Sequence, residues 1–173
     1  MLSKNKYRLP FRDKATTVAI SDPRAHPSSE RLENSVDFLL EREEPILAVA
    51  GGIVWSVKDD STQGGPEEKF ADIKYQNFIT IKHKNGEYSQ YVHLAKDSSL
   101  VEKGDKVKEG QPIAKGIGLV GYTTALHLHF MVFDEDENSL EINWEGKTPK
   151  VFNGVTDKEE LLKEIEKNKQ RDR

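Results

Sequence analysis

The sequence predicts a mainly β protein with an antiparallel β-sheet core and a short C-terminal helix. Short runs rich in β-branched and aromatic residues recur at close intervals from Val36 onward. Turn-forming pairs such as Gly51-Gly52 and Asn85-Gly86 separate these runs, and only residues 156–169 have a clear helical pattern. The expected strands are Val36–Leu40, Ile46–Ala50, Ile53–Val57, Phe78–Lys84, Glu87–Leu94, Gln111–Lys115 and Leu128–Phe133.

The composition indicates one soluble domain and limits which side chains could bind a metal. A chain of 173 residues is long enough for one hydrophobic core and short for two. Its 26 basic and 30 acidic residues are interspersed over most of the chain and give a net charge of −4, which argues against a nucleic-acid partner. The chain has no cysteine, so a metal would have to bind through His, Asp or Glu. No stretch is long enough to span a membrane, and no secretory signal is visible.

Two segments lie outside the regular strand pattern. Residues 1–25 have a polar, proline-containing sequence without a sustained period, so we expect an extended N-terminal segment. The segment 58–76 contains Gly64-Gly65-Pro66 and many charges, and it separates two strand runs. We interpret it as a solvated loop or insertion, most simply a plain connector.

The end of the chain has the pattern of an amphipathic helix. Thr156 and Glu159 form a capping-box pair, and a narrow apolar stripe follows at Leu161, Leu162 and Ile165. Such a stripe is more typical of a helix that docks on the body than of a catalytic element. The expected organisation is an extended segment at 1–25, a β domain at 26–150 and a C-terminal helix within 151–173.

Two histidines alternate with apolar residues in Leu126-His127-Leu128-His129-Phe130. In a strand, His127 and His129 point to one face and their apolar neighbours to the other. Two adjacent imidazoles repel each other when both are protonated, whereas neutral imidazoles can bind a cation, so this pattern is compatible with a metal site. The alternative is a pair of surface histidines on a half-exposed strand.

Asp37 lies between Val36 and Phe38 in another expected strand, so its carboxylate points away from the face of its apolar neighbours. It is either a rim residue or a metal ligand. Two imidazoles and one carboxylate, with a fourth position left for water, form a known catalytic zinc set. His129, Asp37 and one further histidine would complete it.

The pair Asn85-Gly86 predicts a two-residue hairpin turn, which pairs residue 84 with 87, 83 with 88 and 78 with 93. In this register His83 and His93 lie on opposite faces of the hairpin. The face of His83 also carries Ile79, Ile81, Tyr88 and Val92. The face of His93 carries Phe78, Thr80 and Tyr91. We therefore expect His83 and His93 to serve different sites.

Four motifs follow one another with a characteristic order and spacing: Pro45–Val54, Asn85–Leu94, Val101–Ile113 and His127–Phe130. The second ends in Tyr-Val-His-Leu, and the last reads His-Leu-His-Phe. Together they resemble the lysostaphin-type zinc endopeptidases, which cleave peptidoglycan. The resemblance runs from about His26 to Phe133. It implies an antiparallel core of the duplicated-hybrid-motif or barrel-sandwich type.

Carried over by position, the resemblance implies that Asp37 and His129 bind one zinc ion and that His93 and His127 are catalytic histidines beside it. His83 matches no functional position. The common family pattern H-x-G-x-D would place the first ligand at position 33, which is Glu33 here. Other family branches have this histidine further upstream, and we prefer His26 as the first metal ligand. Glu33, or no third ligand, remains the alternative.

The implied function is a zinc-dependent metalloendopeptidase that hydrolyses peptide bonds in peptidoglycan cross-bridges by a metal-activated water, assisted by two histidines. One alternative is an inactive family member that binds the cell wall or regulates another enzyme. A second is a biotinyl- or lipoyl-type carrier domain, because the Gly-x-x-Val rhythm of Val101–Ile113 also occurs there. We expect a monomer with a peptide or peptidoglycan substrate. The resemblance implies an extracytoplasmic or cell-envelope location.

Overall fold

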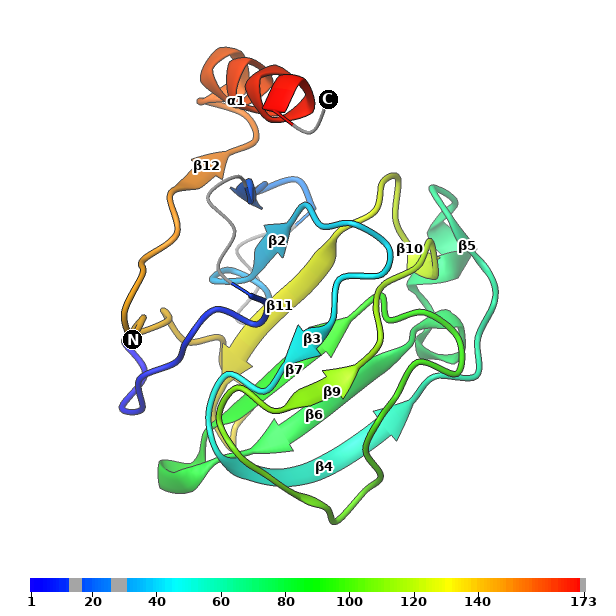
Figure 1. The fold of residues 1–173 in the computed structure, drawn as a ribbon, viewed down its shortest axis with the longest axis vertical. Coiled ribbons are helices and arrows are strands. Elements are labelled where there is room, and N and C mark those ends of the chain that lie inside the picture. Colours follow the sequence, from blue (N-terminus) through cyan, green and yellow to red (C-terminus); the bar gives the residue numbers. More distant parts are fainter. Residues whose placement is uncertain (13–16, 26–30, 172–173) are drawn as a thin grey trace.

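The computed structural model describes residues 1–12, 17–25 and 31–171, and its largest element is a mixed eight-stranded sheet (Figure 1). The strand order is β12-β1-β2-β11-β7-β6-β4-β8, and every neighbouring pair is antiparallel except β12 and β1. These strands are β1 (Ala19–Ser21), β2 (Val36–Phe38), β4 (Gly52–Lys58), β6 (Phe78–Lys82), β7 (Tyr88–Val92), β8 (Lys106–Val107), β11 (Leu128–Phe133) and β12 (Val151–Asn153).

Two small sheets accompany the large one. One pairs β3 (Ile46–Leu47) with β9 (Pro112–Ala114), and the other pairs β5 (Gly64–Gly65) with β10 (Gly121–Tyr122). The predicted mainly β fold is confirmed, and each of the seven expected runs contains a strand. The strands that were not predicted are only two or three residues long, which is too short for a recognisable alternation.

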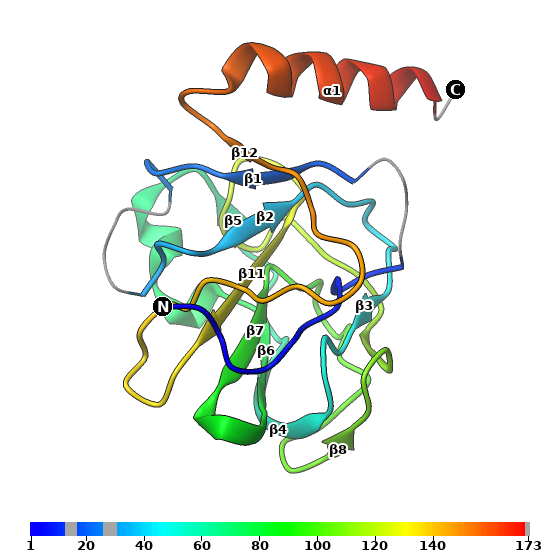
Figure 2. The same ribbon diagram turned by 90° about the vertical axis from the view of Figure 1, so that its left-hand side faces the viewer.

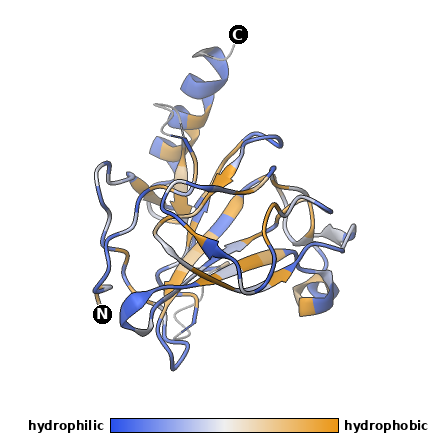
Figure 3. Cartoon of the chain, turned by 60° about the horizontal axis from the view of Figure 1, so that its bottom comes forward, coloured by the Kyte–Doolittle hydropathy of each residue, from blue (hydrophilic) through white to orange (hydrophobic). Residues whose placement is uncertain are grey.

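One face of the large sheet forms the hydrophobic core. Ile79, Tyr91 and Phe130 point into it and are fully buried, and the β3–β9 pair belongs to the same core cluster. The Oη atom of Tyr91 accepts a hydrogen bond from the Val49 amide at 2.9 Å, which ties the segment after β3 to the sheet. Figure 3 shows the apolar residues concentrated in the strands. Because side chains alternate along a strand, the opposite face carries Asp37 and His129.

The N-terminal segment packs on the β domain. Tyr7 and Phe11 are buried within the main core, and isolated bridges join Leu2 to Glu141 and Tyr7 to Trp144. Burial of these aromatic rings explains why an extended segment with no sustained hydrophobic period is held in place. The boundaries of the three predicted regions remain predictions.

Helix α1 (Lys158–Arg171) lies at one end of the molecule next to β12 (Figures 1 and 2). It begins two residues later than the expected 156, and the Thr156 hydroxyl donates to the Asp157 carboxylate. Leu161 docks the helix in a small cluster with Val18 and Phe152, as the apolar stripe predicts. No helix within the described ranges is long and apolar enough to cross a membrane.

The predicted register of the β6–β7 hairpin was wrong by one residue. Phe78 pairs with Val92, and the His83 amide donates to the Glu87 carbonyl at 2.8 Å. The turn therefore takes three residues, Lys84–Gly86, of which Asn85 and Gly86 have positive φ angles of 63° and 69°. As a result Tyr91, and not Tyr88 or Val92, shares the face of His83.

The segment 58–76 is also more ordered than the predicted plain connector. It contains β5 and two short 3₁₀-helices, Glu68–Ala71 and Ile73–Tyr75. Phe70 in the first of these is buried. The parallel pairing of β5 with β10 joins this segment to the loop that precedes His127.

Candidate metal and catalytic site

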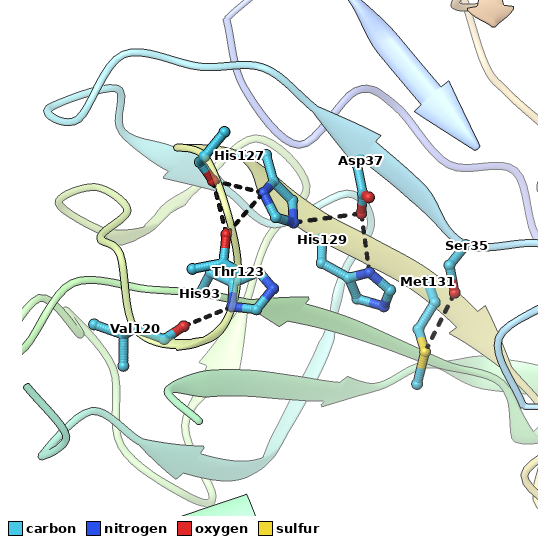
Figure 4. A network of polar contacts seen from close by, with 9 residues as sticks. Ser35, Asp37, His93, Val120, Thr123, His127, His129 and Met131 are labelled. Atoms are coloured by element: carbon cyan, nitrogen blue, oxygen red, sulfur yellow. Dashed lines mark hydrogen bonds and ion pairs between the residues drawn. The ribbon is translucent and has the colours of Figure 1, made fainter. Parts of the chain in front are cut away.

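Asp37 and His129 face each other on neighbouring strands (Figure 4). The register of β2 and β11 pairs the two residues directly, and Asp37 Oδ1 lies 3.0 Å from His129 Nδ1. Both side chains are largely covered. Two ligands of one tetrahedral zinc, each about 2.0–2.2 Å from the ion, lie roughly 3–3.5 Å apart. The two donor atoms therefore fit adjacent positions on a single metal ion.

His127 precedes β11 and lies on the same side as His129 (Figure 4). Its Nδ1 atom is 2.8 Å from the Ala125 carbonyl oxygen, and a carbonyl only accepts, so Nδ1 carries the hydrogen. In the neutral ring the lone pair is then on Nε2, which lies 3.7 Å from Asp37 Oδ1. The Thr123 hydroxyl lies beside the same ring, 3.3 Å from Nδ1, and donates to Ala125 at 2.8 Å.

His93 reaches the site through an unusual backbone conformation. It follows β7 with a φ of 67°, a left-handed value that is uncommon outside glycine and often found at functional sites. Its ring centroid lies 4.6 Å from that of His127 and 6.2 Å from that of His129. The Nδ1 atom donates to the Val120 carbonyl at 2.7 Å, which again leaves Nε2 as the acceptor in the neutral ring.

Burial sets the charge state of His93. Loss of hydration disfavours the imidazolium, and the neighbouring rings of His127 and His129 add like-charge repulsion, which together lower the pKa of His93 to about 3. The Val120 hydrogen bond and Asp37 act in the opposite direction and do not outweigh burial. The ring is therefore neutral at physiological pH.

The structure brings together four of the predicted site residues, Asp37, His93, His127 and His129 (Figure 4). The fifth, His26, lies outside the described residues. Within the described part of the chain, no group of three or more His, Asp or Glu side chains is arranged to hold a metal ion.

His83 is held elsewhere, as predicted, although the register behind that prediction was wrong. Its two ring nitrogens lie 2.9 Å from the Gly51 carbonyl and 2.8 Å from Ser89 Oγ.

The profile of Peptidase family M23 matches residues 31–142, more than half of the chain. The chain belongs to Peptidase family M23. This confirms the predicted family and removes the carrier-domain alternative. The matched range of this M23 domain contains Asp37, His93, His127 and His129, and Glu33 as well, whereas His26 lies before it.

Two curated relatives of the M23 domain come from Vibrio cholerae serotype O1. The peptidoglycan DD-endopeptidase ShyB is 31% identical over 130 residues, which cover 74% of this chain and 27% of that protein. The peptidoglycan DD-endopeptidase ShyA is 30% identical over 141 residues, covering 79% of this chain and 29% of that protein. The chain thus matches less than a third of the length of either relative.

A solved structure, a zinc-containing peptidase from Vibrio cholerae, has a TM-score of 0.55 and 26% identity. The match covers 84% of this chain and 41% of that one. It supports the same fold for the M23 domain.

Sequence reasoning missed the groups that orient the two histidines at Nδ1. They are the backbone carbonyls of Val120 and Ala125, together with the hydroxyl of Thr123. Every residue has a backbone carbonyl, so the residue type does not show which carbonyl accepts a hydrogen bond from a histidine. Only the fold reveals these partners. Thr123 is a polar residue four positions before His127, which is a weak local signal.

Proposed function

We propose that this M23 domain is a zinc-dependent endopeptidase that hydrolyses peptide bonds in peptidoglycan cross-bridges. The observation that carries the proposal is the cluster of a carboxylate–imidazole pair, Asp37 and His129, with two further imidazoles, His93 and His127, beside it. The peptidoglycan endopeptidases among the relatives support the choice of substrate. Because peptidoglycan belongs to the cell envelope, the proposed site of action is extracytoplasmic.

Asp37 Oδ1 and His129 Nδ1 would hold the zinc ion, with His26 as the proposed third ligand. An anionic oxygen and imidazole nitrogens are the donors found in catalytic zinc sites, and the 3.0 Å separation of the first two suits shared coordination. The zinc-containing peptidase among the structural neighbours favours this metal. When bound, zinc supplies a Lewis acid that makes a water nucleophilic at neutral pH and polarises the scissile carbonyl.

His93 and His127 would orient the attacking water and move the protons of the reaction. Each ring has its Nδ1–H engaged by a carbonyl, so each has an Nε2 lone pair available as a base. Because burial lowers the pKa of His93, its neutral ring would orient the attacking water by accepting a hydrogen bond at Nε2, and His127 would take the proton at its own Nε2 and become an imidazolium. That imidazolium then stabilises the negative charge on the carbonyl oxygen and delivers a proton to the leaving amine.

The second candidate is a catalytically inactive M23 domain that binds the cell wall or regulates another enzyme. One observation favours it, namely that Glu33 stands where the common family pattern H-x-G-x-D has its first histidine. A domain with only two protein ligands would hold zinc weakly and would lack the activated nucleophile.

Zinc stoichiometry separates the two candidates. The metal content of purified wild type, His26→Ala, Glu33→Ala and His129→Ala would be measured by mass spectrometry. The proposal predicts about one zinc per chain in wild type and Glu33→Ala, and none in His26→Ala and His129→Ala. A wild type without zinc at micromolar free zinc would establish the inactive module. Loss of zinc in Glu33→Ala with retention in His26→Ala would move the first ligand to Glu33.

Activity is then tested on purified peptidoglycan with direct cross-links and on peptidoglycan with glycine bridges. Mass spectrometry of the released fragments identifies which bond is cleaved. The His93→Gln protein, which keeps the proposed zinc ligands, is the matched control. Release of the same fragments by wild type and by this control would contradict the proposed role of His93.

A further inference from the structure

The segment 58–76 touches the loop before His127 through two strands made largely of glycine. Strands β5 and β10 run parallel, with Gly64 paired to Gly121. The Gly121 amide donates to the Gln63 carbonyl at 2.9 Å, and the Thr123 amide donates to the Gly65 carbonyl at 3.1 Å. Two backbone hydrogen bonds from one side of this loop therefore end on the segment.

The contact is too close for any residue other than glycine at position 64. A Cβ atom on Gly64 would lie 2.4 Å from the Leu119 carbonyl oxygen and 2.7 Å from that of Gly121. Both obstacles are backbone atoms, which cannot rotate away as a side chain can. On the other strand, Gly121 has a φ of 76°, a left-handed value that also favours glycine.

Asn77 directly follows the segment and joins it to His93. Its buried side-chain amide accepts from the Ser61 amide at 3.0 Å and donates to the carbonyls of Ser61 at 2.9 Å and Leu94 at 3.1 Å. Its own carbonyl oxygen accepts from the His93 amide at 3.0 Å. A single residue thus holds the start of the segment and the left-handed backbone of His93.

The β5–β10 pairing and the hydrogen bonds of Asn77 both connect the segment 58–76 to the histidines of the site. The loop supported by β5 provides the Val120 carbonyl that accepts from His93 Nδ1, and the Ala125 carbonyl that accepts from His127 Nδ1. The Gly118 amide also donates to the His93 carbonyl at 2.9 Å. A hydrogen bond at Nδ1 fixes both the tautomer and the ring orientation of a histidine.

We propose that the segment 58–76 and Asn77 form a support that orients His93 and His127, with Gly64 and Asn77 as positioning residues for the reaction. The inference rests on the proposed catalytic role of the two histidines. It assigns to this segment a task in the site that its composition did not indicate. Displacing β5 from β10 shifts the loop and releases the two Nδ1–H groups, while Asp37 and His129 keep their strand pairing.

The test compares Gly64→Ala with Gly51→Ala in the zinc-loaded full chain. The control introduces the same methyl group where it would meet only the Val107 carbonyl oxygen at an ordinary 3.6 Å. Nitrogen-15 NMR detects the Nδ1–H protons of His93 and His127 as slowly exchanging signals. We expect both signals in wild type and in Gly51→Ala, and loss of at least one in Gly64→Ala. The zinc content should stay at about one in all three proteins.

The rate of cross-link hydrolysis should fall in the variant that loses an Nδ1–H signal. We expect kcat for cross-link hydrolysis to fall about 10- to 100-fold in Gly64→Ala, the size of effect typical of lost orienting partners, with KM changed far less. Intact Nδ1–H signals together with a wild-type kcat in Gly64→Ala would overturn the inference. If wild type cleaves no peptidoglycan, the proposed function fails, and the NMR comparison still decides whether the segment orients the rings.

A measurement on wild type covers the case in which Gly64→Ala does not fold. Hydrogen exchange would be followed for the amides of Gly121 and Thr123 and for the two Nδ1–H groups under increasing urea. Exchange of all four in one common opening step is the expected result. Exchange of the two amide hydrogens at low urea, while both Nδ1–H groups stay protected, would overturn the inference. The rings would then be held in place without β5.

Discussion

The Asp37 carboxylate and the His129 imidazole lie 3.0 Å apart although 92 positions separate them in the chain. Direct pairing of β2 with β11 produces this contact, since opposed residues on neighbouring antiparallel strands bring their side chains together. Val36 and Phe38 on either side of Asp37 are buried in the core, so the carboxylate cannot turn away without moving the strand. Strand pairing therefore places the two proposed zinc ligands side by side.

Replacing Asp37 by Asn tests this pair with almost no change in shape. The amide keeps the size of the side chain but loses the negative charge that balances the metal, so we expect zinc affinity to fall at least about 100-fold. Competition with a chromogenic chelator measures the affinity. Asp60→Asn is the matched control, because Asp60 is an exposed carboxylate paired with Lys58. Zinc binding as tight as that of wild type would contradict the assignment of Asp37.

Replacing His127 by Gln separates catalysis from metal binding. The variant removes an imidazole that contributes no proposed ligand, so zinc should remain at about one per chain while kcat falls roughly 10²- to 10⁴-fold. Metal analysis and cross-link hydrolysis are measured on the same preparation. His83→Gln provides the control, since that ring lies on the core side of the hairpin, bonded to Gly51 and Ser89. Comparable rates in both variants would remove His127 from the mechanism.

Buried His83 makes the stability depend on pH. Burial lowers the pKa of His83 below its ordinary value of about 6.5. Well above pH 6.5 the ring is neutral in both the folded and the unfolded state. As the pH falls below 6.5, the unfolded chain binds a proton that the folded protein does not, so the free energy of unfolding decreases by up to about 1.4 kcal/mol per pH unit.

Urea unfolding at pH 7.5 and 5.5 measures this effect in wild type and His83→Gln, both loaded with zinc. We expect the loss of stability between the two pH values to be smaller in the variant. Titration of the zinc ligands is common to the two proteins and cancels in the comparison. An equal loss in both would mean that His83 takes up its proton in the folded protein as easily as in the unfolded chain.

Tyr91→Phe should lower stability and leave the site intact. Removal of the hydroxyl deprives the buried Val49 amide of its acceptor, which costs about 1–3 kcal/mol of unfolding free energy. Zinc content and kcat should not change, because Tyr91 points into the core on the face opposite His129. Tyr122→Phe, at a half-exposed position, should change the free energy of unfolding by less than about 0.5 kcal/mol. A larger effect at Tyr122 than at Tyr91 would refute the account.

Much of the site could be predicted from local pattern. Alternation along a strand predicted that His127 and His129 share a face above buried Leu128 and Phe130, and that Asp37 points away from its apolar neighbours. Each of these inferences uses only adjacent residues, whose side-chain directions follow from the strand geometry itself. They did not indicate which strands would pair.

The hairpin and the segment 58–76 show the limits of local pattern. Asn85-Gly86 correctly predicted the position of a turn, but the turn also includes Lys84. The change from two to three turn residues reversed the predicted faces of β7. The segment 58–76 was predicted to be a plain connector, whereas its Gly64 allows the close approach of β5 to β10. In both cases the outcome depends on a partner that the local sequence does not specify.

By itself, the sequence determined the family, the positions of seven strands and the faces of Asp37, His127 and His129. Only the tertiary structure decided the pairing of Asp37 with His129, the left-handed backbone of His93 and the carbonyls that orient the histidines. The physical reason is that alternation is a property of a single strand. Hydrogen-bond register and a positive φ at His93 are stabilised instead by distant partners, among them the carbonyls of Asn77 and Val120.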